Sequence, residues 1–370
     1  MNVVNTSCKV CIPAASRLSC VLTPGRGIAL WASFLLTGAI GVSLAVPVQP
    51  TVAPSAATVL GTERTAFTVN QRSTFLLGIS YYGGLGASEA QIRADLKAMR
   101  QAGFNWLRVW ATWGAYGQEV SAVDGEGRPR QEYLTKLQFL VAEADRLGLI
   151  VDVTLSRGNG VTGPARLTTA QAHRQAVETV TKALRNHRNW YLDVANERNI
   201  KDARFTTYEE LKALRAAARA IAPHLLVTAS HAGDISRQEL QQYLQVAQVD
   251  FLAPHRPRHP DSPKQTQAKT RELLRWAAES GRTLPVHYQE PFRRGWGRWE
   301  PTAEDFLTDL RGAQAGGAAG WCFHNGDQRS DPEGKPRRCF DLRGEAGLWD
   351  RLDDVEREAI RRLTQHFKNP

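Results

Sequence analysis

The sequence predicts a (β/α)8 barrel, and two features of its pattern support this fold class. From about residue 75 onward, short apolar runs alternate with amphipathic stretches of helical period, which is typical of parallel strands joined by crossover helices. An open doubly wound sheet would need a glycine-rich phosphate turn, but the Gly83-Gly84-Leu85-Gly86 turn after the first run lacks the G-x-G-x-x-G spacing. The expected strands are residues 75–80, 104–111, 149–156, 189–195, 225–230, 249–254, 284–289 and 319–325.

The helices expected between these runs are recognisable by their ends. Four hydroxyl residues are followed three positions later by Gln or Glu, a spacing in which both side chains satisfy free amides at a helix start. They are Ser88, Thr168, Thr206 and Ser236. Gly103 and Gly148 stand where helices should stop before the next strand.

The amino-terminal part of the chain predicts export. Residues 1–26 contain three basic residues and no acidic one, and residues 27–46 form an apolar run. This order is typical of a secretory signal peptide over residues 1–46, or of an uncleaved signal anchor with residues 27–46 in the membrane. Both alternatives make the rest of the chain secreted or periplasmic.

A linker is expected to separate this leader from the barrel. Residues 47–69 begin with a stretch rich in Pro, Ala, Thr and Ser, and residues 70–370 are expected to form one barrel domain. This domain contains Cys322 and Cys339, which could pair in an oxidising compartment, but the sequence does not reveal their separation.

Composition excludes several classes of protein. The 370 residues carry 47 Lys and Arg against 37 Asp and Glu, a net charge of +10, and 42% are hydrophobic. This is too apolar for a disordered chain, and five Cys are too few for a disulfide scaffold. No recognition motif accompanies the basic charge, so a nucleic-acid partner is not expected. Neither a cofactor nor a metal is expected, and the oligomeric state is not readable.

Two carboxylates stand at the ends of two expected strands. Glu197 follows the fourth run and Glu290 follows the seventh, 93 residues later. Functional groups of such barrels project from the carboxyl ends of strands, and the fourth and seventh strands lie on opposing sides of an eight-stranded ring. Side-chain alternation places Glu290 on one face with Tyr288 and Val286. The two acids are therefore expected to face each other across the mouth of the barrel.

A facing carboxyl pair is what cleavage of a glycosidic bond requires. One acid protonates the leaving oxygen, and the other must be ionised to attack the anomeric carbon or stabilise its charge. Arg108, on the inward face of the second strand, is the expected cation beside one of them. Strand-end residues expected to contact a sugar are Trp110, His231, His255 and Tyr288, because aromatic rings stack on sugars and polar groups bind their hydroxyls.

These residues resemble the retaining glycoside hydrolases of clan A, most nearly the cellulase- and mannanase-like proteins around family 5. Arg108 in NWLRVW resembles the clan arginine, and Asn196-Glu197 in DVANER resembles the pair whose Asn binds the sugar 2-hydroxyl and whose Glu is the acid/base. Glu290 in PVHYQEPFR resembles the nucleophile, and Trp321 in AGWCFHNG the tryptophan that floors the reacting subsite. The resemblance implies an oligo- or polysaccharide substrate cleaved by double displacement.

Two departures from the family pattern predict a divergent member. The place of the third-strand His reads Thr154-Leu155-Ser156-Arg157, and the sixth-strand His-x-Tyr is replaced by His255-Arg256-Pro257-Arg258. These departures leave open a catalytically inactive, barrel-shaped carbohydrate-binding protein. A metal-dependent barrel hydrolase would require a His-x-His motif on the first strand. That strand instead reads Leu77-Gly78-Ile79-Ser80-Tyr81, so this class is not expected.

A group of arginines follows the sixth and seventh strands. Its members are Arg256, Arg258, Arg293, Arg294 and Arg298. They could form a basic rim that contacts an anionic glycan, such as one that bears uronic acids, or they could be ordinary solvated charges.

Overall fold

From Leu76 onward, strands and helices alternate as the sequence predicts. The protein is described by a computed structural model that covers residues 57–114, 117–158, 166–295, 298–326 and 341–368. Its barrel strands are β4 (Leu76–Ser80), β5 (Trp106–Trp110), β6 (Ile150–Thr154), β7 (Trp190–Asp193), β8 (Leu226–Thr228), β10 (Pro254–His255), β11 (His287–Tyr288) and β12 (Gly320–Phe323). The helices that follow them are α1 (Glu89–Gln101), α2 (Gln131–Arg146), α3 (Ala170–Leu184), α4 (Tyr208–Ile221), α5 (Arg237–Gln242), α6 (Ser262–Glu279), α7 (Ala303–Gly316) and α8 (Asp354–Lys368).

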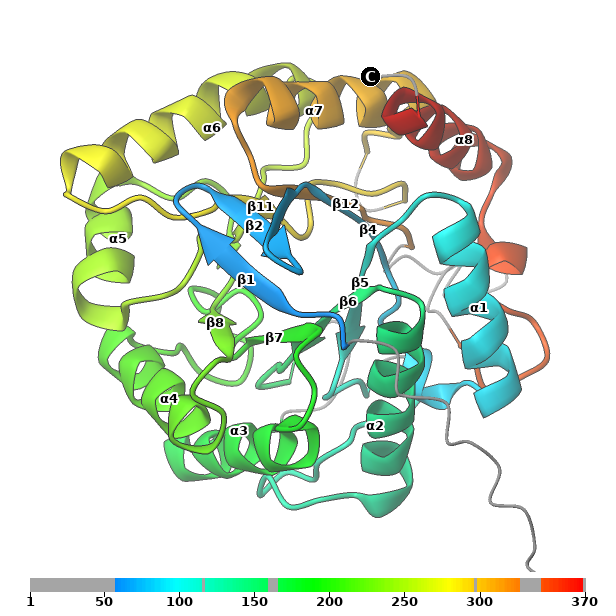
Figure 1. Ribbon diagram of the computed structural model, residues 1–370, viewed down its shortest axis with the longest axis vertical. Coiled ribbons are helices and arrows are strands. Elements are labelled where there is room, and N and C mark those ends of the chain that lie inside the picture. Colours follow the sequence, from blue (N-terminus) through cyan, green and yellow to red (C-terminus); the bar gives the residue numbers. More distant parts are fainter. Residues whose placement is uncertain (1–56, 115–116, 159–165, 296–297, 327–340, 369–370) are drawn as a thin grey trace, which may run out of the picture. The chain divides into compact units, whose positions relative to one another are not determined.

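The strands close into a ring. Seven of them form one parallel sheet in the order β11-β12-β4-β5-β6-β7-β8. The gap between β8 and β11 is filled by the segment that leads into β10: the Asp250 amide donates to the Val227 carbonyl at 3.0 Å, and the Leu252 amide donates to the Pro285 carbonyl at 2.9 Å. Figure 1 shows α1 to α8 arranged around this ring. The predicted (β/α)8 barrel is confirmed.

Alternation along the strands separates the barrel interior from the layer under the helices. On β5, Trp106 belongs to an interior cluster with Tyr191 of β7, whereas Leu107 and Val109 belong to the larger cluster that the helices cover. Gly78 of β4 makes room for the indole, because a Cβ at this position would lie 1.7 Å from Trp106 Cε3. The middle of the barrel is therefore filled with side chains, and any site must lie at one of its ends.

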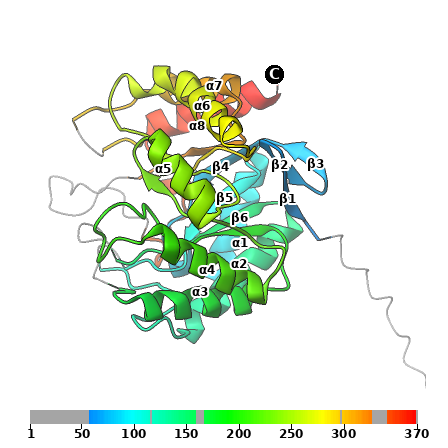
Figure 2. The same ribbon diagram turned by 90° about the vertical axis from the view of Figure 1, so that its left-hand side faces the viewer.

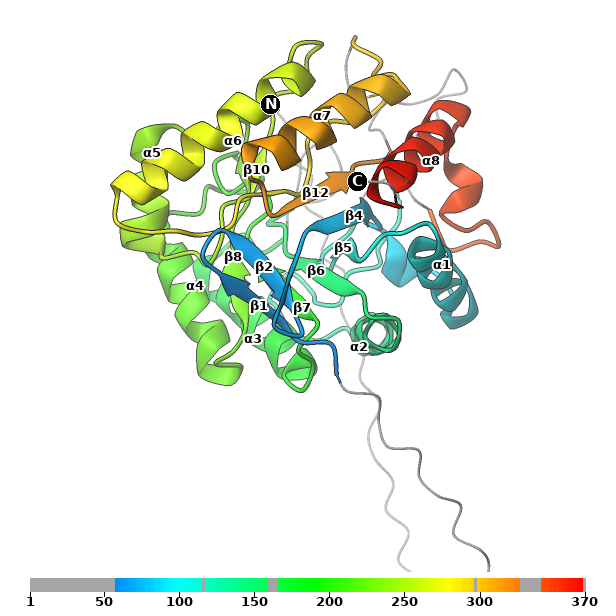
Figure 3. The same cartoon turned by 45° about the horizontal axis from the view of Figure 1, so that its top comes forward.

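A small antiparallel sheet covers one end of the barrel. It consists of β1 (Leu60–Glu63), β2 (Ala66–Val69) and β3 (Arg72–Thr74), and it leads directly into the start of β4. Figures 2 and 3 show this sheet at the end of the barrel where the strands begin. Phe67 is fully buried there, with its ring centroid 5.1 Å from that of Phe251. The mouth at the opposite, carboxyl ends of the strands is left for the site.

The expected linker over residues 47–69 is therefore wrong for residues 60–69. The apolar residues of this segment are few and separated by polar ones, so no strand pattern stands out. Two of them, Leu60 and Phe67, nevertheless belong to the interior cluster of the barrel. One signal was available. Asn70 and Gln71 both have positive φ, 51° and 65°, as the two-residue turns of tight β-hairpins require, and Asn favours this conformation.

The helix starts agree with the expected ones to within one residue. Ser88 and Ser236 cap α1 and α5 as expected, and Ser236 forms the complete capping box with Glu239. For α3 and α4 the caps are Thr169 and Thr207, each one residue after the expected Thr. The sequence offers two consecutive threonines at both places, so local chemistry does not choose between them.

Several expectations concern residues outside the described ranges. They are the leader over residues 1–46, the first part of the linker and Cys339, so Cys322 is seen alone, as a free and buried thiol. In the part of the chain that is described, no helix has the length and apolar character needed to cross a membrane.

Candidate active site

Arg108 organises the carboxyl end of the barrel from β5. Its side chain is fully buried, and its Nε lies 3.0 Å from the Thr154 hydroxyl and 3.1 Å from Asp152 Oδ2, both on β6. One Nη2 contact, at 3.1 Å, goes to Asp193 Oδ2 at the end of β7. Two neighbouring strands, β6 and β7, thus hold the guanidinium of Arg108 in place by buried ion pairs and a hydrogen bond.

The same guanidinium joins the two predicted strand ends. Nη2 also donates to Asn196 Oδ1 at 3.0 Å, and Nη1 donates to Glu290 Oε1. Burial by itself lowers the pKa of Arg108, but Glu290, Asp152 and Asp193 together raise it above its usual range. Arg108 is therefore a permanent cation against one oxygen of Glu290.

Glu197 and Glu290 lie close together, as predicted. One oxygen of each, together with one ring nitrogen of His255, lie within 4.8 Å of one another. His255 Nδ1 is 3.2 Å from Glu197 Oε1 and 3.7 Å from Glu290 Oε2. The Glu290 side chain is 6% exposed and the Glu197 side chain 18%, so both acids are sheltered yet reachable.

The backbone at Glu197 is held in an unusual conformation. Its φ is +45°, in the left-handed region that residues with a Cβ rarely adopt, and such strain is concentrated at functional sites. The Glu197 amide donates to the Ser230 hydroxyl at 2.9 Å. From the end of β6, Arg157 donates to the carbonyls of Asn196 at 2.6 Å and Glu197 at 3.1 Å. These contacts fix the turn that carries both site residues.

Both carboxyl groups have lowered pKa values. For Glu290, burial raises the pKa, but His255, His324, Arg108 and Arg258 outweigh burial and bring it well below the usual range. For Glu197, burial again raises the pKa, and the hydrogen bond and charge of His255 lower it by more. Glu290 is therefore ionised at neutral pH, as a nucleophile must be.

Two further groups surround Glu290: Arg258, which the sequence suggests only as part of a possible basic rim, and His324, which is not among the predicted site residues. Arg258 Nη2 lies 2.9 Å from Glu290 Oε2 and 4.0 Å from Glu197 Oε1. His324, just after β12, places Nε2 3.8 Å from Glu290 Oε2 and hydrogen-bonds the Tyr82 hydroxyl. Continuing the side-chain alternation past the end of β12 could have suggested His324. That the Arg258 side chain reaches Glu290 is visible only in the tertiary structure.

An aromatic group adjoins these polar residues. The Tyr82 ring lies 5.4 Å from both Trp110 and Trp113, and the two indoles are 5.2 Å apart and perpendicular. The Arg108 guanidinium carbon is 5.7 Å from the Trp110 ring centroid. Trp110 thus lies beside Arg108, the residue that holds one oxygen of Glu290, and its contact with a sugar stays a prediction.

Two predicted contact residues point away from the mouth. Tyr288 is fully buried, and its hydroxyl bonds the Thr270 hydroxyl of α6 at 2.6 Å. Trp321 is also fully buried, and its Nε1 donates to Asp309 Oδ2 of α7 at 2.6 Å. Both predicted roles are wrong for one reason: Tyr288 and Trp321 occupy the helix-facing positions of β11 and β12.

The expected alternation at Glu290 fails for a related reason. In β11, His287 faces the interior, where its ring centroid is 4.6 Å from that of Trp106, and Tyr288 faces the helices, but the strand ends there. Glu290 can therefore point into the mouth although Tyr288 does not.

His231 lies at the rim rather than in contact with the acids. It is buried, in β9 (His231–Ala232), with Nδ1 3.2 Å from the Tyr243 hydroxyl and Nε2 3.4 Å from Glu239 Oε1. Burial lowers its pKa to about 4, so His231 is neutral at neutral pH. The nearby Asp234 pairs with Arg256.

Glu197, His255 and Glu290 have the donor types of a metal site, but their neighbours disfavour one. Both Glu290 oxygens already contact guanidinium groups, Arg108 on one side and Arg258 on the other. A divalent cation would have to displace these charges or lie beside them. The site around Glu197, His255 and Glu290 is better suited to a neutral or anionic ligand than to a metal ion.

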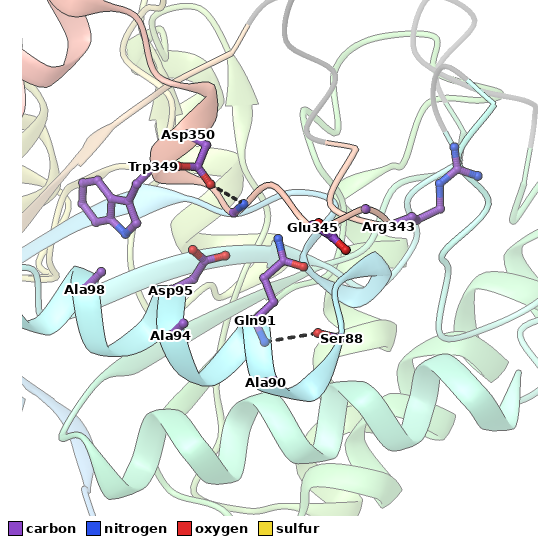
Figure 4. Close-up of a pocket in the computed structure, with 12 residues that line it drawn as sticks. Ser88, Ala90, Gln91, Ala94, Asp95, Ala98, Arg343, Glu345, Trp349 and Asp350 are labelled. Atoms are coloured by element: carbon purple, nitrogen blue, oxygen red, sulfur yellow. Dashed lines mark hydrogen bonds between the residues drawn. The ribbon is translucent and has the colours of Figure 1, made fainter.

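A separate hollow lies outside the mouth, along α1. It is about 750 Å³ and is lined by α1 residues and by the chain before α8, including Trp349 (Figure 4). Its one buried acid, Asp95, already accepts hydrogen bonds from the Tyr81 hydroxyl at 2.8 Å and the Leu348 amide at 3.2 Å. Asp350 also lines the hollow and its charge raises the pKa of Asp95, but it accepts a hydrogen bond from the Gly347 amide at 2.9 Å, so both acids serve to hold the chain before α8.

Comparison with solved structures connects this geometry to a known fold. A family 5 glycoside hydrolase from Bacteroides vulgatus superposes with a TM-score of 0.62 at 15% identity, over 85% of this chain and 71% of that one. The chain has the fold of the family 5 glycoside hydrolases. The family 5 subfamily 18 protein of Streptomyces cattleya, in complex with GlcNAc, superposes at 0.57 with 17% identity, over 80% and 81% of the two chains.

A third similar structure is the endo-1,4-β-D-mannanase of Thermotoga petrophila, with a TM-score of 0.54 and 18% identity, over 79% of this chain and all of that one. No protein-family model and no curated protein matches the sequence. The fold that the resemblance implies is thus confirmed by structure neighbours at low sequence identity.

Proposed function

We propose that this chain is an exported glycoside hydrolase that cleaves a β-linked glycan with retention of configuration. The observation that carries the proposal is the approach of Glu197 and Glu290 to within 4.8 Å at the mouth of the barrel. Retaining enzymes have carboxyl groups about 5–5.5 Å apart, and inverting ones leave about 6.5–9.5 Å for a water. The similar structures, two of them named as a family 5 hydrolase and a mannanase, support a β-glycan substrate. Export rests on the leader over residues 1–46.

In the proposed reaction Glu290 attacks the anomeric carbon and forms a covalent glycosyl-enzyme. Glu197 gives its proton to the departing oxygen and then takes one from the water that releases the sugar. Arg108 holds one oxygen of Glu290 and keeps this carboxylate ionised. A sugar bound over Glu197 excludes water from it, which favours the protonated form required in the first step.

Azide rescue tests these roles. Glu290→Ala should lose nearly all hydrolysis of an activated aryl β-glycoside, and added azide should restore turnover by forming the α-glycosyl azide. Glu197→Ala, with the same reagents, should form the β-glycosyl azide. Glu279→Ala, an exposed carboxylate on α6, is the control and should behave as the wild type. Unaltered hydrolysis in Glu290→Ala would refute the assignment.

An alternative is a catalytically inactive carbohydrate-binding barrel. Arg258 favours it, because its guanidinium contacts Glu290 Oε2 at 2.9 Å, an oxygen that could otherwise attack. Binding of β-glycans by the wild-type chain without any turnover would support this alternative over hydrolysis.

A further inference from the structure

The arginines that follow the sixth and seventh strands separate into two groups in the structure. Arg256 pairs with Asp234, and Arg294 donates to Asp353 Oδ2 at 2.8 Å and to the Pro301 carbonyl at 2.7 Å. These two arginines hold loops together. Arg258 instead contacts the carboxylate pair, and Arg293 contacts His324 beside it, so these two arginines lie inside the mouth.

Arg258 lies where a substrate must pass. Its Nη2 is 2.9 Å from Glu290 Oε2 and 4.0 Å from Glu197 Oε1, and the bond to be cleaved has to lie between these same two carboxylates. A bound sugar therefore has to move the Arg258 guanidinium from its place beside Glu290. That movement breaks a sheltered ion pair, since the Arg258 side chain is only 12% exposed.

Arg293 supplies a second positive charge on the same side. It is 6% exposed, and its Nη1 lies 3.2 Å from His324 Nε2, the nitrogen that is 3.8 Å from Glu290 Oε2. Arg258 at Glu290 Oε2 and Arg293 behind His324 thus place two positive charges on this side of Glu290.

We propose that the glycan bound at this mouth bears a carboxylate, as in a uronic acid, and that Arg258 and Arg293 bind it. A planar carboxylate matches the guanidinium fork and replaces the contact that Arg258 gives up at Glu290, whereas a neutral hydroxymethyl group does not. Exchange of partners by Arg258 also frees Glu290 Oε2 when the correct substrate arrives. This inference rests on the proposed hydrolase function and adds the class of its substrate.

Matched substrates test the proposal. β-1,4-Oligomannuronate is compared with β-1,4-manno-oligosaccharides, and β-1,4-oligoglucuronate with cello-oligosaccharides, because the members of each pair differ only in the C6 carboxylate. Release of reducing ends and calorimetric binding are both measured. In at least one pair, we expect the uronate to be preferred by at least about tenfold, the worth of one charge-assisted hydrogen bond.

The variants Arg258→Gln and Arg293→Gln should each reduce this preference, chiefly by lowering activity or binding on the uronate. Arg237→Gln removes the same charge from an exposed ion pair with Glu279 on the outside of the barrel and should leave the preference unchanged. Circular dichroism and thermal melting of each variant establish that it folds, and the ratio between paired substrates is independent of how much active protein is present.

The outcomes separate this inference from the proposed function. Cleavage of the neutral member as well as or better than the uronate in both pairs would overturn the inference and leave the hydrolase proposal standing. Preferential binding of a uronate without cleavage would support the inference and count against hydrolysis. Absence of both binding and cleavage for all four oligosaccharides would count against both.

Discussion

The variant Asp309→Asn should stabilise the protein at alkaline pH and leave its stability nearly unchanged at acidic pH. Asp309 is fully buried on α7, where it accepts hydrogen bonds from Trp321 Nε1 and from the Thr266 hydroxyl. Burial raises the pKa of Asp309 to about 6, although both hydrogen bonds act to lower it. The ordinary value of 3.8 applies to the unfolded chain.

The sign and the size of the effect follow from these two pKa values. Between them the folded chain binds more protons than the unfolded chain, so the free energy of unfolding falls as the pH rises through this window. The destabilisation by the buried Asp309 charge is absent at pH values below the pKa of the unfolded chain. It is complete at pH values above the pKa of the folded chain. A difference of about two pKa units corresponds to roughly 3 kcal/mol, of which about 2 kcal/mol is lost between pH values of about 4.5 and 8.

Urea unfolding followed by tryptophan fluorescence at these two pH values measures the effect. Relative to the wild type, Asp309→Asn should gain about 2 kcal/mol more at the higher pH than at the lower. Thr266→Val removes a hydrogen bond that lowers the pKa of Asp309, so it should make the pH dependence steeper. Glu304→Gln removes an exposed charge from the same helix and is the control. An equal shift at both pH values for Asp309→Asn would refute the reasoning.

Two further predictions concern the site and the base of the barrel. His255→Ala should move both limbs of the pH–rate profile to higher pH, because His255 lowers the pKa of Glu197 and of Glu290 against the effect of burial; unmoved limbs would contradict this. Phe67→Ala should reduce the free energy of unfolding by about 3–5 kcal/mol in urea titrations, because the ring is fully buried against Phe251; a cost below about 1 kcal/mol would show that the terminal sheet is not part of the core.

Part of the candidate site was predictable because it depends on local pattern. Arg108 lies inside the barrel because β5 alternates regularly over its whole length, with Trp106 inward and Leu107 outward. Glu197 and Glu290 could be selected because polar residues that directly follow apolar runs come at strand ends. The order of the elements along the chain then assigns both acids to the same end of the barrel.

Alternation was a poor guide where the strands are short. β11 contains only His287 and Tyr288, so a shift of one residue in the pattern beyond it changes which side chain enters the mouth. On β12, Trp321 and Phe323 are as apolar as a sugar platform would be, and nothing in their spacing separates a core position from a platform. The hydrogen bond from Trp321 to Asp309 of α7 decided the matter.

The amino-acid order alone determined the succession of the eight barrel strands, the inward position of Arg108 and the two acids at strand ends, because each of these depends on neighbours within a few residues. Tertiary structure alone decided that Glu197 and Glu290 come within 4.8 Å, and that Arg157, Arg258 and His324 complete their surroundings. The physical reason is that closure of the ring brings together groups far apart in the chain, and long side chains then reach partners that no sequence spacing encodes.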